Sequence, residues 1–268
     1  MASIVLFFII GGFIGSFLNV VILRLYKKEQ FIKGRSMCFN CGHILNKLDL
    51  IPIASFLFLK GKCRYCGIAL SLQYPIIELL TGILFAFLFI NYYELLITSY
   101  EFLFLLFLGS SLIILFIYDL KYKLVPHEII WPTVAGAIAY KTIPLMLNIK
   151  YLTLNALYYD FLSAIFATAF IVFIVVITKQ KGMGWGDAPL TFIITFIPGF
   201  PYNLFVFWLS FIIGGITGIV LLILRKAKLK TEVPFGPFLI GALGLIAILN
   251  YFNIDFFLVE YNLRGFSF

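Results

Sequence analysis

Two aspartates interrupt long apolar runs of this chain, where a carboxylate is costly and is a functional candidate. Asp187 ends the sequence GMGWGD at Gly182–Asp187, and Asp119 ends the run SSLIILFIYD. If the fold brings both carboxylates together they share one proton, because like charges at close range do not both ionise. One acid then activates a water while the other polarises a carbonyl, as in aspartic proteases. The plainer interpretation makes each a helix-terminal acid in the membrane interface.

The glycine-rich sequence before Asp187 does not match a phosphate-binding loop. A P-loop needs GxxxxGK[ST] between a strand and a helix of a soluble βαβ unit. Because glycine lacks a Cβ, we expect Gly182, Gly184 and Gly186 to let the backbone turn sharply and to leave room beside Asp187.

All four cysteines lie in one polar segment, as the C-x-x-C pairs Cys38 with Cys41 and Cys63 with Cys66. This spacing is typical of a tetrathiolate zinc site. Four protein ligands leave no open position on the metal, so we expect Zn²⁺ to be structural and to fold a segment too small for its own core. The alternatives are two disulfides, reactive thiols, or a nucleic-acid-binding zinc ribbon.

The composition predicts an all-α polytopic membrane protein. Of the 268 residues, 63% are hydrophobic and 12% are charged, whereas soluble domains carry about 25% charged residues. The apolar runs are continuous, which excludes the alternating strands of a membrane β-barrel. The sixth run is short and ends at Pro198-Gly199, so seven and eight spans both fit. The expected spans are 2–25, 75–97, 100–118, 129–148, 160–178, 188–199, 202–224 and 236–253.

The basic residues predict the orientation of the chain, because Lys and Arg accumulate in cytoplasmic loops. The net charge is +8, and 17 of the 20 basic residues fall in segments 24–74, 119–128, 179–181 and 225–235. With eight spans these segments share one face, so the N-terminus is expected outside. We then attribute the positive net charge to the basic cytoplasmic loops and to their attraction to the lipid bilayer. We do not attribute it to nucleic-acid binding. The basic residues follow the first apolar run, unlike in a signal peptide, so that helix is expected to be uncleaved.

These residues resemble the type IV prepilin peptidases, the leader peptidases of type IV pili and type II secretion. The resemblance covers seven blocks in one order: Gly15–Leu25, Arg35–Leu45, Leu48–Gly67, Ser71–Gly82, Tyr118–Pro126, Gly182–Asp187 and Pro234–Ala242. It implies that Asp119 and the GxGD aspartate Asp187 are catalytic and that the three glycines form an active-site loop.

The family's reaction removes the basic leader of a prepilin or pseudopilin, after a glycine, at the cytoplasmic face of the bacterial inner membrane. Bacterial members often then methylate the new N-terminal residue with S-adenosylmethionine, and the four-cysteine module is typical of those bifunctional members. The resemblance therefore divides the chain into a first transmembrane helix (1–25), a cytoplasmic zinc module (26–74) and a transmembrane aspartic peptidase domain (75–268).

The sequence departs from the family pattern near the aspartates. His127 stands where Asp is usual, Lys181 where many members have Glu, and Ala188-Pro189 where a Lys often follows the GxGD. These changes leave both aspartates in place and bear on substrate preference and methylation.

Asn19 and Glu78 are polar residues near the expected cytoplasmic ends of the first two spans. They are candidates for contact with the substrate or cofactor, and hydrogen bonds that pin helices are the alternative. For the whole protein, the alternative functions are an ion- or proton-coupled transporter using Asp119 and Asp187, and a zinc-linked scaffold without chemistry. A transporter would place its acids near the membrane midplane in repeated elements, and no repeat is apparent.

Overall fold

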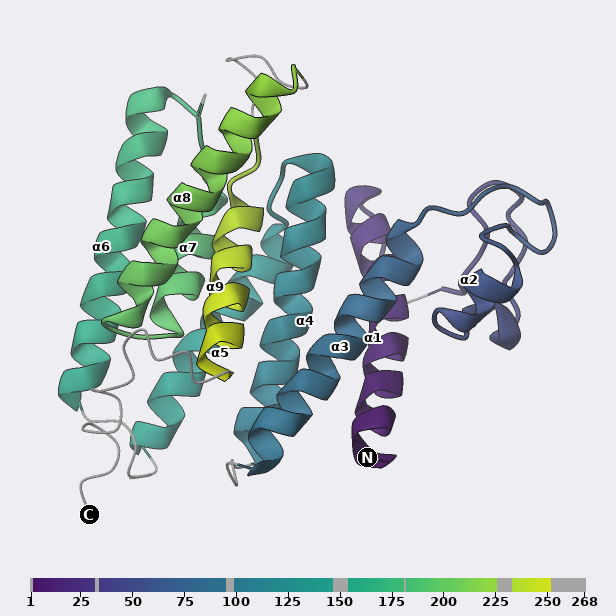
Figure 1. The fold of residues 1–268 in the computed structure, drawn as a ribbon, viewed down its shortest axis with the longest axis horizontal. Coiled ribbons are helices and arrows are strands. Elements are labelled where there is room, and N and C mark those ends of the chain that lie inside the picture. Colours follow the sequence, from purple (N-terminus) through teal and green to yellow (C-terminus); the bar gives the residue numbers. More distant parts are fainter. Residues whose placement is uncertain are drawn as a thin grey trace. The chain divides into compact units, whose positions relative to one another are not determined.

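The computed structural model describes residues 2–31, 34–94, 99–146, 154–180, 182–225 and 233–251. Its secondary structure is helical apart from two isolated antiparallel bridges (Figure 1). The elements are α1 (Ala2–Tyr26), the 3₁₀ turn η1 (Lys47–Leu50), α2 (Ala54–Phe58), α3 (Gln73–Glu94), α4 (Ser99–Tyr122), α5 (His127–Met146), α6 (Leu154–Thr178), α7 (Asp187–Phe196), α8 (Tyr202–Ile223) and α9 (Gly236–Tyr251).

All eight apolar segments expected from the sequence form helices, which confirms the all-α polytopic fold. Within the described ranges, α1, α3, α4, α5, α6 and α8 are long and apolar enough to cross a membrane. Helix α7 has ten residues, or about 15 Å at 1.5 Å per residue, roughly half of a ~30 Å hydrocarbon core. The short sixth segment is therefore too short to cross a membrane as a helix.

The chain divides into two compact units, Met1–Ile114 and Leu115–Phe268. In the first unit α1 and α3 pack antiparallel along small residues. A Cβ added at Gly15 would lie 2.7 Å from Glu78 Cα, and one added at Gly11 would lie 2.6 Å from the Thr81 carbonyl oxygen. The glycines thus allow the close backbone approach that small residues give membrane helices.

The polar segment between α1 and α3 is built around two similar turns. The Gly42 and Cys38 backbones are hydrogen-bonded as are those of Gly67 and Cys63, and both glycines have a left-handed φ, +67° and +69°. Asp49 of η1 ties the segment together by accepting hydrogen bonds from Arg64 Nε at 2.7 Å and Tyr65 Oη at 3.1 Å.

In the second unit α7 forms the centre, and α5, α6, α8 and α9 pack around it (Figure 1). Eight of its ten residues are buried, and four of them, Leu190, Ile193, Ile194 and Phe196, are among the largest fully buried side chains. The hydroxyl groups of Thr191 and Thr195 donate hydrogen bonds to backbone carbonyls of the preceding turn. The core of this unit is therefore a short helix enclosed by longer ones.

Two boundaries differ from the expected ones in ways that matter for the polar residues. Helix α4 continues through Leu120, Lys121 and Tyr122, so Asp119 lies in its last turn rather than after it. Helix α6 begins at Leu154 instead of 160, which places Asp160 inside a helix. Apolar periodicity marks the extent of the hydrocarbon core, whereas a helix extends into the interface wherever its backbone can stay hydrogen-bonded.

Candidate active site and metal centre

Asp119 is held in place by the start of a distant helix. Its side chain is 5% exposed, and its Oδ2 accepts a hydrogen bond from the N–H of Gly236, the first residue of α9, at 3.1 Å. The first N–H groups of a helix have no partner within that helix and favour an anion. Sequence reasoning did not identify Gly236 as a partner of Asp119, although the block Pro234–Ala242 belongs to the family resemblance.

Asp187 is the first residue of α7 and is 7% exposed. Its Oδ2 accepts the N–H of Gly184 at 2.9 Å, and its own N–H donates to the Gly184 carbonyl at 3.1 Å. The GxGD sequence thus closes a tight turn upon its own aspartate. The hydrogen bond from Gly184 therefore holds the Asp187 carboxylate at the N-terminus of α7 without any contact from a substrate.

The sharp turn expected in this loop occurs two residues earlier than the glycines. Helix α6 ends with the hydrogen bonds of a Schellman motif, from Lys179 N to Val176 O and from Gln180 N to Val175 O. Lys179 and Gln180 carry the left-handed φ values of +51° and +63°, whereas Gly182, Gly184 and Gly186 do not have a left-handed φ. A left-handed backbone conformation therefore does not explain these three glycines.

Gly186 shows a steric requirement instead. A Cβ at this position would lie 2.6 Å from Val125 Cβ, which precedes α5, and real Cβ atoms do not approach so closely. Around Gly184 the nearest atom to an added Cβ is 4.0 Å away. One glycine thus lets the loop pack against the segment that follows Asp119, and the other leaves open space.

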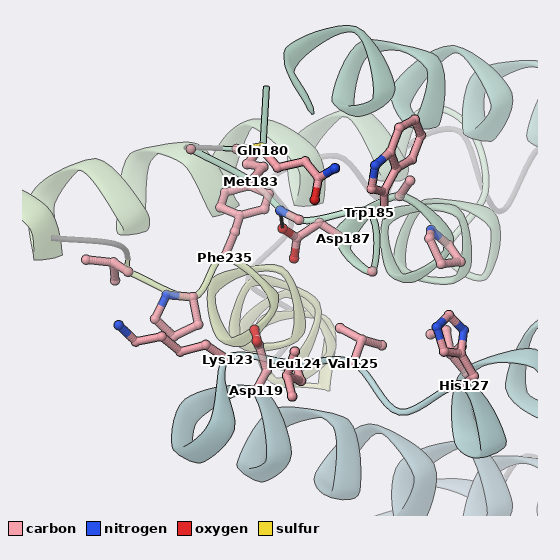
Figure 2. Close-up of a pocket in the computed structure, with 18 of the residues that line it drawn as sticks. Asp119, Lys123, Leu124, Val125, His127, Gln180, Met183, Trp185, Asp187 and Phe235 are labelled. Atoms are coloured by element: carbon pink, nitrogen blue, oxygen red, sulfur yellow. Dashed lines mark hydrogen bonds between the residues drawn. The ribbon is translucent and has the colours of Figure 1, made fainter. Parts of the chain in front are cut away.

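Both aspartates line one pocket of about 620 Å³. Figure 2 shows their carboxylates directed into it from opposite sides, Asp119 from the end of α4 and Asp187 from the start of α7. A volume of this size is typical of a ligand site. The fold therefore brings together two buried acids that are 68 positions apart in the sequence.

The rest of the pocket wall contains residues that the sequence analysis did not propose as site residues. They include the departures His127, Ala188 and Pro189, and also Lys123, Trp131, Gln180, Met183, Trp185 and Phe235. Lys181 lies outside the described residues. Trp131 and Trp185 are 57% and 53% exposed, so the wall offers aromatic surface as well as charge. Proximity to Asp119 and Asp187 in sequence could have suggested most of these residues.

Asn19 and Glu78 belong to the first compact unit. Asn19 Nδ2 donates to the carbonyls of Gly15 and Tyr74, each at 3.2 Å, and its Oδ1 accepts from Gln73 Nε2 at 3.3 Å. Glu78 Oε2 accepts the N–H of Ile53 at 2.7 Å. These hydrogen bonds join α1, α3 and the start of α2. They correspond to the alternative in which Asn19 and Glu78 hold helices together.

The four cysteines form a cluster that fits a metal ion. Their sulfur atoms all lie within 4.8 Å of one another, and the Cys38 and Cys66 sulfurs are 3.9 Å apart. A tetrahedral site with Zn–S bonds of ~2.3 Å requires sulfur separations of about 3.8 Å. Cys38 and Cys63 are buried and Cys41 and Cys66 are exposed, so the cluster lies at the surface of the module.

Backbone N–H groups prepare two of these sulfurs to be anionic. The N–H of Ile68 lowers the pKa of Cys66 to about 7, and the N–H of Cys41 lowers that of Cys38 despite its burial. At Cys41 the N–H of His43 also lowers the pKa, but burial and the neighbouring sulfurs outweigh it and raise the pKa to about 11. Four thiolates this close repel each other unless a cation binds them.

The fold and the two sites define a polytopic helical membrane protein with two carboxylates in one pocket and a four-cysteine module. The chain belongs to the type IV leader peptidase family: that family matches residues 106–219, and the bacterial peptidase A24 N-terminal domain matches residues 9–92.

Several curated relatives are named prepilin leader peptidase/N-methyltransferase. The protein of Aeromonas salmonicida strain A449 is 31% identical over 278 residues, which cover 91% of this chain and 89% of the relative. That of Bacillus subtilis strain 168 is 32% identical over 90% of this chain and 92% of the relative. That of Myxococcus xanthus strain DK1622 is 47% identical over 81 residues, 30% of this chain and 24% of the relative. No solved structure matches.

We expect Gly186→Ala to destabilise the protein by about 1–3 kcal/mol, because the new methyl group overpacks against Val125. A second substitution, Val125→Ala, should restore part of this loss, so that the double variant melts above Gly186→Ala in a thermal scan of detergent-solubilised protein. Gly184→Ala is the control and should change stability by no more than about 0.5 kcal/mol. Equal melting temperatures for the two alanine variants would contradict the packing argument.

Proposed function

We propose that this protein is a membrane aspartic endopeptidase that removes the basic leader from type IV prepilins or pseudopilins. The observation that carries the proposal is the convergence of Asp119 and Asp187 on one pocket. Of the two acids, one in its ionised form takes a proton from water, and the other in its protonated form donates to the scissile carbonyl. The names of the relatives supply the substrate class.

The surroundings of Asp119 and Asp187 are consistent with one acid acting as the general base and the other as the general acid. Each carboxylate accepts a single backbone N–H through Oδ2, from Gly236 and from Gly184. Neither acid has an ion pair with a basic side chain among the described residues, so nothing fixes both in the ionised form. A shared proton can therefore reside on either carboxyl group, as a general acid–base pair requires.

The transporter alternative is not favoured. Asp119 lies in the last turn of α4 and Asp187 at the first residue of α7, which are helix ends and not mid-membrane breaks. A transporter would hold its coupling acids near the midplane of discontinuous helices. The relatives that span most of the chain are named as peptidases.

We further propose that the pocket faces the cytoplasm of a bacterium and that the N-terminus lies outside. The last turn of α4 and the first residue of α7 both contribute to the pocket, as do Lys123 and Gln180 beside them. Lys123 and Gln180 therefore lie at the same end of the second unit, and the basic loop segments to which they belong are of the kind that remains cytoplasmic. A basic leader in the cytosol, followed by an apolar helix in the bilayer, would present its junction at this depth.

We propose Zn²⁺ as the ion held by Cys38, Cys41, Cys63 and Cys66. All four sulfurs are used by the metal, so it would fold the module and take no part in peptide cleavage. The η1 turn and the two cysteine turns bury little apolar surface, since η1 and α2 contain no buried residue. A metal therefore supplies stability that a core of this size does not.

Methylation of the new N-terminal residue with S-adenosylmethionine is the second proposed activity. It rests on the names of the relatives and on the four-cysteine module. Asn19 and Glu78 remain candidate contacts for the substrate or cofactor, although their observed hydrogen bonds serve helix packing.

For the peptidase, Asp119→Asn and Asp187→Asn should each reduce cleavage of a purified prepilin by at least about 100-fold, because the pair loses its proton-transfer function. Cleavage in detergent micelles is followed by the mass of the mature pilin. The matched control is Glu128→Gln, which removes one exposed carboxylate near the pocket and should leave the rate unchanged. Undiminished cleavage by either aspartate variant would refute the dyad.

For the metal, the purified protein should contain one zinc ion per chain by plasma mass spectrometry. Cys63→Ser should abolish stoichiometric zinc, because three thiolates leave the tetrahedral site incomplete. Ser36→Ala in the same module is the control and should retain the metal. A metal-free wild type that melts at the same temperature with and without added zinc would rule out a structural ion.

For methyl transfer, a pre-cleaved pilin incubated with S-adenosylmethionine should gain one methyl group by mass in the presence of either wild type or Asp119→Asn. The reason is that the proposed role of Asp119 concerns only peptide hydrolysis. If the wild type cleaves the prepilin but never methylates the product, this protein is a peptidase alone.

A further inference from the structure

A buried ion pair lies inside the second unit, away from the pocket. Lys141 of α5 and Asp160 of α6 are 5% and 6% exposed, and Lys141 Nζ lies 2.5 Å from Asp160 Oδ2. Lys141 is about 21 Å beyond His127 along α5, and Asp160 is about 27 Å before Thr178 along α6. Charged side chains buried within the spanning helices of a membrane protein are rare and are functional candidates.

The other oxygen of Asp160 holds the turn that follows α7. Asp160 Oδ1 accepts the N–H of Phe200 at 2.7 Å. Gly199 beside it has φ +74°, and a Cβ added there would lie 2.7 Å from the same oxygen. The Asp160 carboxylate therefore packs directly against the backbone of the turn, and position 199 has no space for a side chain.

Lys141 contacts the end of α7 directly. Its Nζ lies 5.1 Å from the ring centroid of Phe196, the last residue of α7, which is 1% exposed. Next to this contact Asn203 of α8 donates to Ser163 of α6. We call Lys141, Asp160, Ser163, Phe196, Phe200 and Asn203 the anchor cluster; it joins α5, α6, α7, the turn and α8.

Helix α7 connects the anchor cluster directly to the pocket acid Asp187. Asp187 is the first residue of this helix and Phe196 the last, about 13.5 Å apart. A short helix with most of its residues buried moves as one body, so a shift at one end displaces the other. Misplacement of a catalytic group by about 1 Å can cost 10²-fold in rate.

We propose that Asp160, with its charge balanced by Lys141, is a positioning residue that sets the depth of α7 and thereby places Asp187 opposite Asp119. This inference rests on the proposed peptidase function and extends it to residues at the far end of the helix. The decisive contact is the hydrogen bond from the Phe200 N–H. The charge of the pair is secondary, since buried ion pairs are often replaced by neutral groups without loss of stability.

Two neutral double variants separate the hydrogen bond from the charge. Lys141→Met/Asp160→Asn removes both charges but keeps a side-chain oxygen for the Phe200 N–H. Lys141→Met/Asp160→Leu has nearly the same shape and lacks that acceptor. Methionine is chosen because its thioether can still pack on the Phe196 ring.

The test measures prepilin cleavage as kcat and KM over a range of pH, together with hydrogen exchange of the α7 amides and the melting temperature. The Asn double variant should keep kcat within about three-fold of the wild type, with the same pH profile. The Leu double variant should lose kcat by about ten-fold or more at similar KM. Its pH profile should shift, because the spacing of the two aspartates governs their coupled titration, and its α7 amides should exchange faster.

Other outcomes overturn the proposal. It fails if the two double variants have equal kcat, whether both remain active or both lose activity. It also fails if the Leu variant melts lower but keeps the wild-type pH profile and α7 protection, since the cluster would then serve stability alone. A wild type that does not cleave prepilin would instead refute the proposed function, while the exchange comparison would still report on the anchoring of α7.

Gly199→Ala provides a second test with the ion pair intact, for the case in which the Leu variant does not fold. Its new methyl group would press on the Asp160 carboxylate and displace the turn. We expect the same loss of kcat and the same change in pH profile. Gly215→Ala, where an added Cβ meets nothing within 4 Å, is the control, and equal kinetics for both alanine variants would overturn the proposal.

Discussion

The structure of the second unit depends on the enclosure of α7. This helix is too short to cross a membrane, and four longer helices surround it. A fully enclosed helix must satisfy the backbone groups at both of its ends inside the protein, because lipid offers no hydrogen bonds. At the start of α7 the Asp187 N–H donates to the Gly184 carbonyl, and in the turn after α7 the Phe200 N–H donates to Asp160. The candidate active site is thus one of the two polar ends of a buried helix.

Hydrogen bonds between buried carboxylates and backbone N–H groups recur in both compact units of the protein. Glu78, Asp119, Asp160 and Asp187 are all buried, and each accepts a backbone N–H from a residue at or just before the start of a helix. The donors are Ile53, Gly236, Phe200 and Gly184, respectively. Gly236 is the first residue of α9 and Ile53 is the N-cap of α2, so their N–H groups have no partner within the helix and a carboxylate satisfies them. Phe200 and Gly184 lie two and three positions before the first residues of α8 and α7. Among the described residues, only Asp160 of the four carboxylates also forms an ion pair, with Lys141.

The four-cysteine module is held together by other interactions than the buried helices. Its residues are mostly exposed, and its order comes from paired turns, the Asp49 contacts with Arg64 and Tyr65, and the cluster of sulfur atoms. The peptidase-type acids lie in the other compact unit, within Leu115–Phe268. The two candidate sites thus belong to different compact units of the chain.

The sequence by itself determined the features that rest on local pattern. Continuous apolar runs predicted all eight apolar segments that form helices, and the paired C-x-x-C spacing predicted the four sulfurs that cluster. Both signals depend on residues that are close together in the sequence. The breaks at Asp119 and Asp187 singled out both pocket acids, although spacing alone also allowed the plainer interfacial role.

Only the tertiary structure decided which distant groups meet. The N–H of Gly236 on Asp119, the packing of Gly186 against Val125, and the pairing of Lys141 with Asp160 join residues from separate helices. In the sequence Lys141 is only a basic residue outside the four basic segments, and its burial depends on how α5, α6 and α7 pack. Periodicity fixes the face and length of each helix, but the contacts across helices follow from side-chain packing and from backbone groups that must find partners away from water.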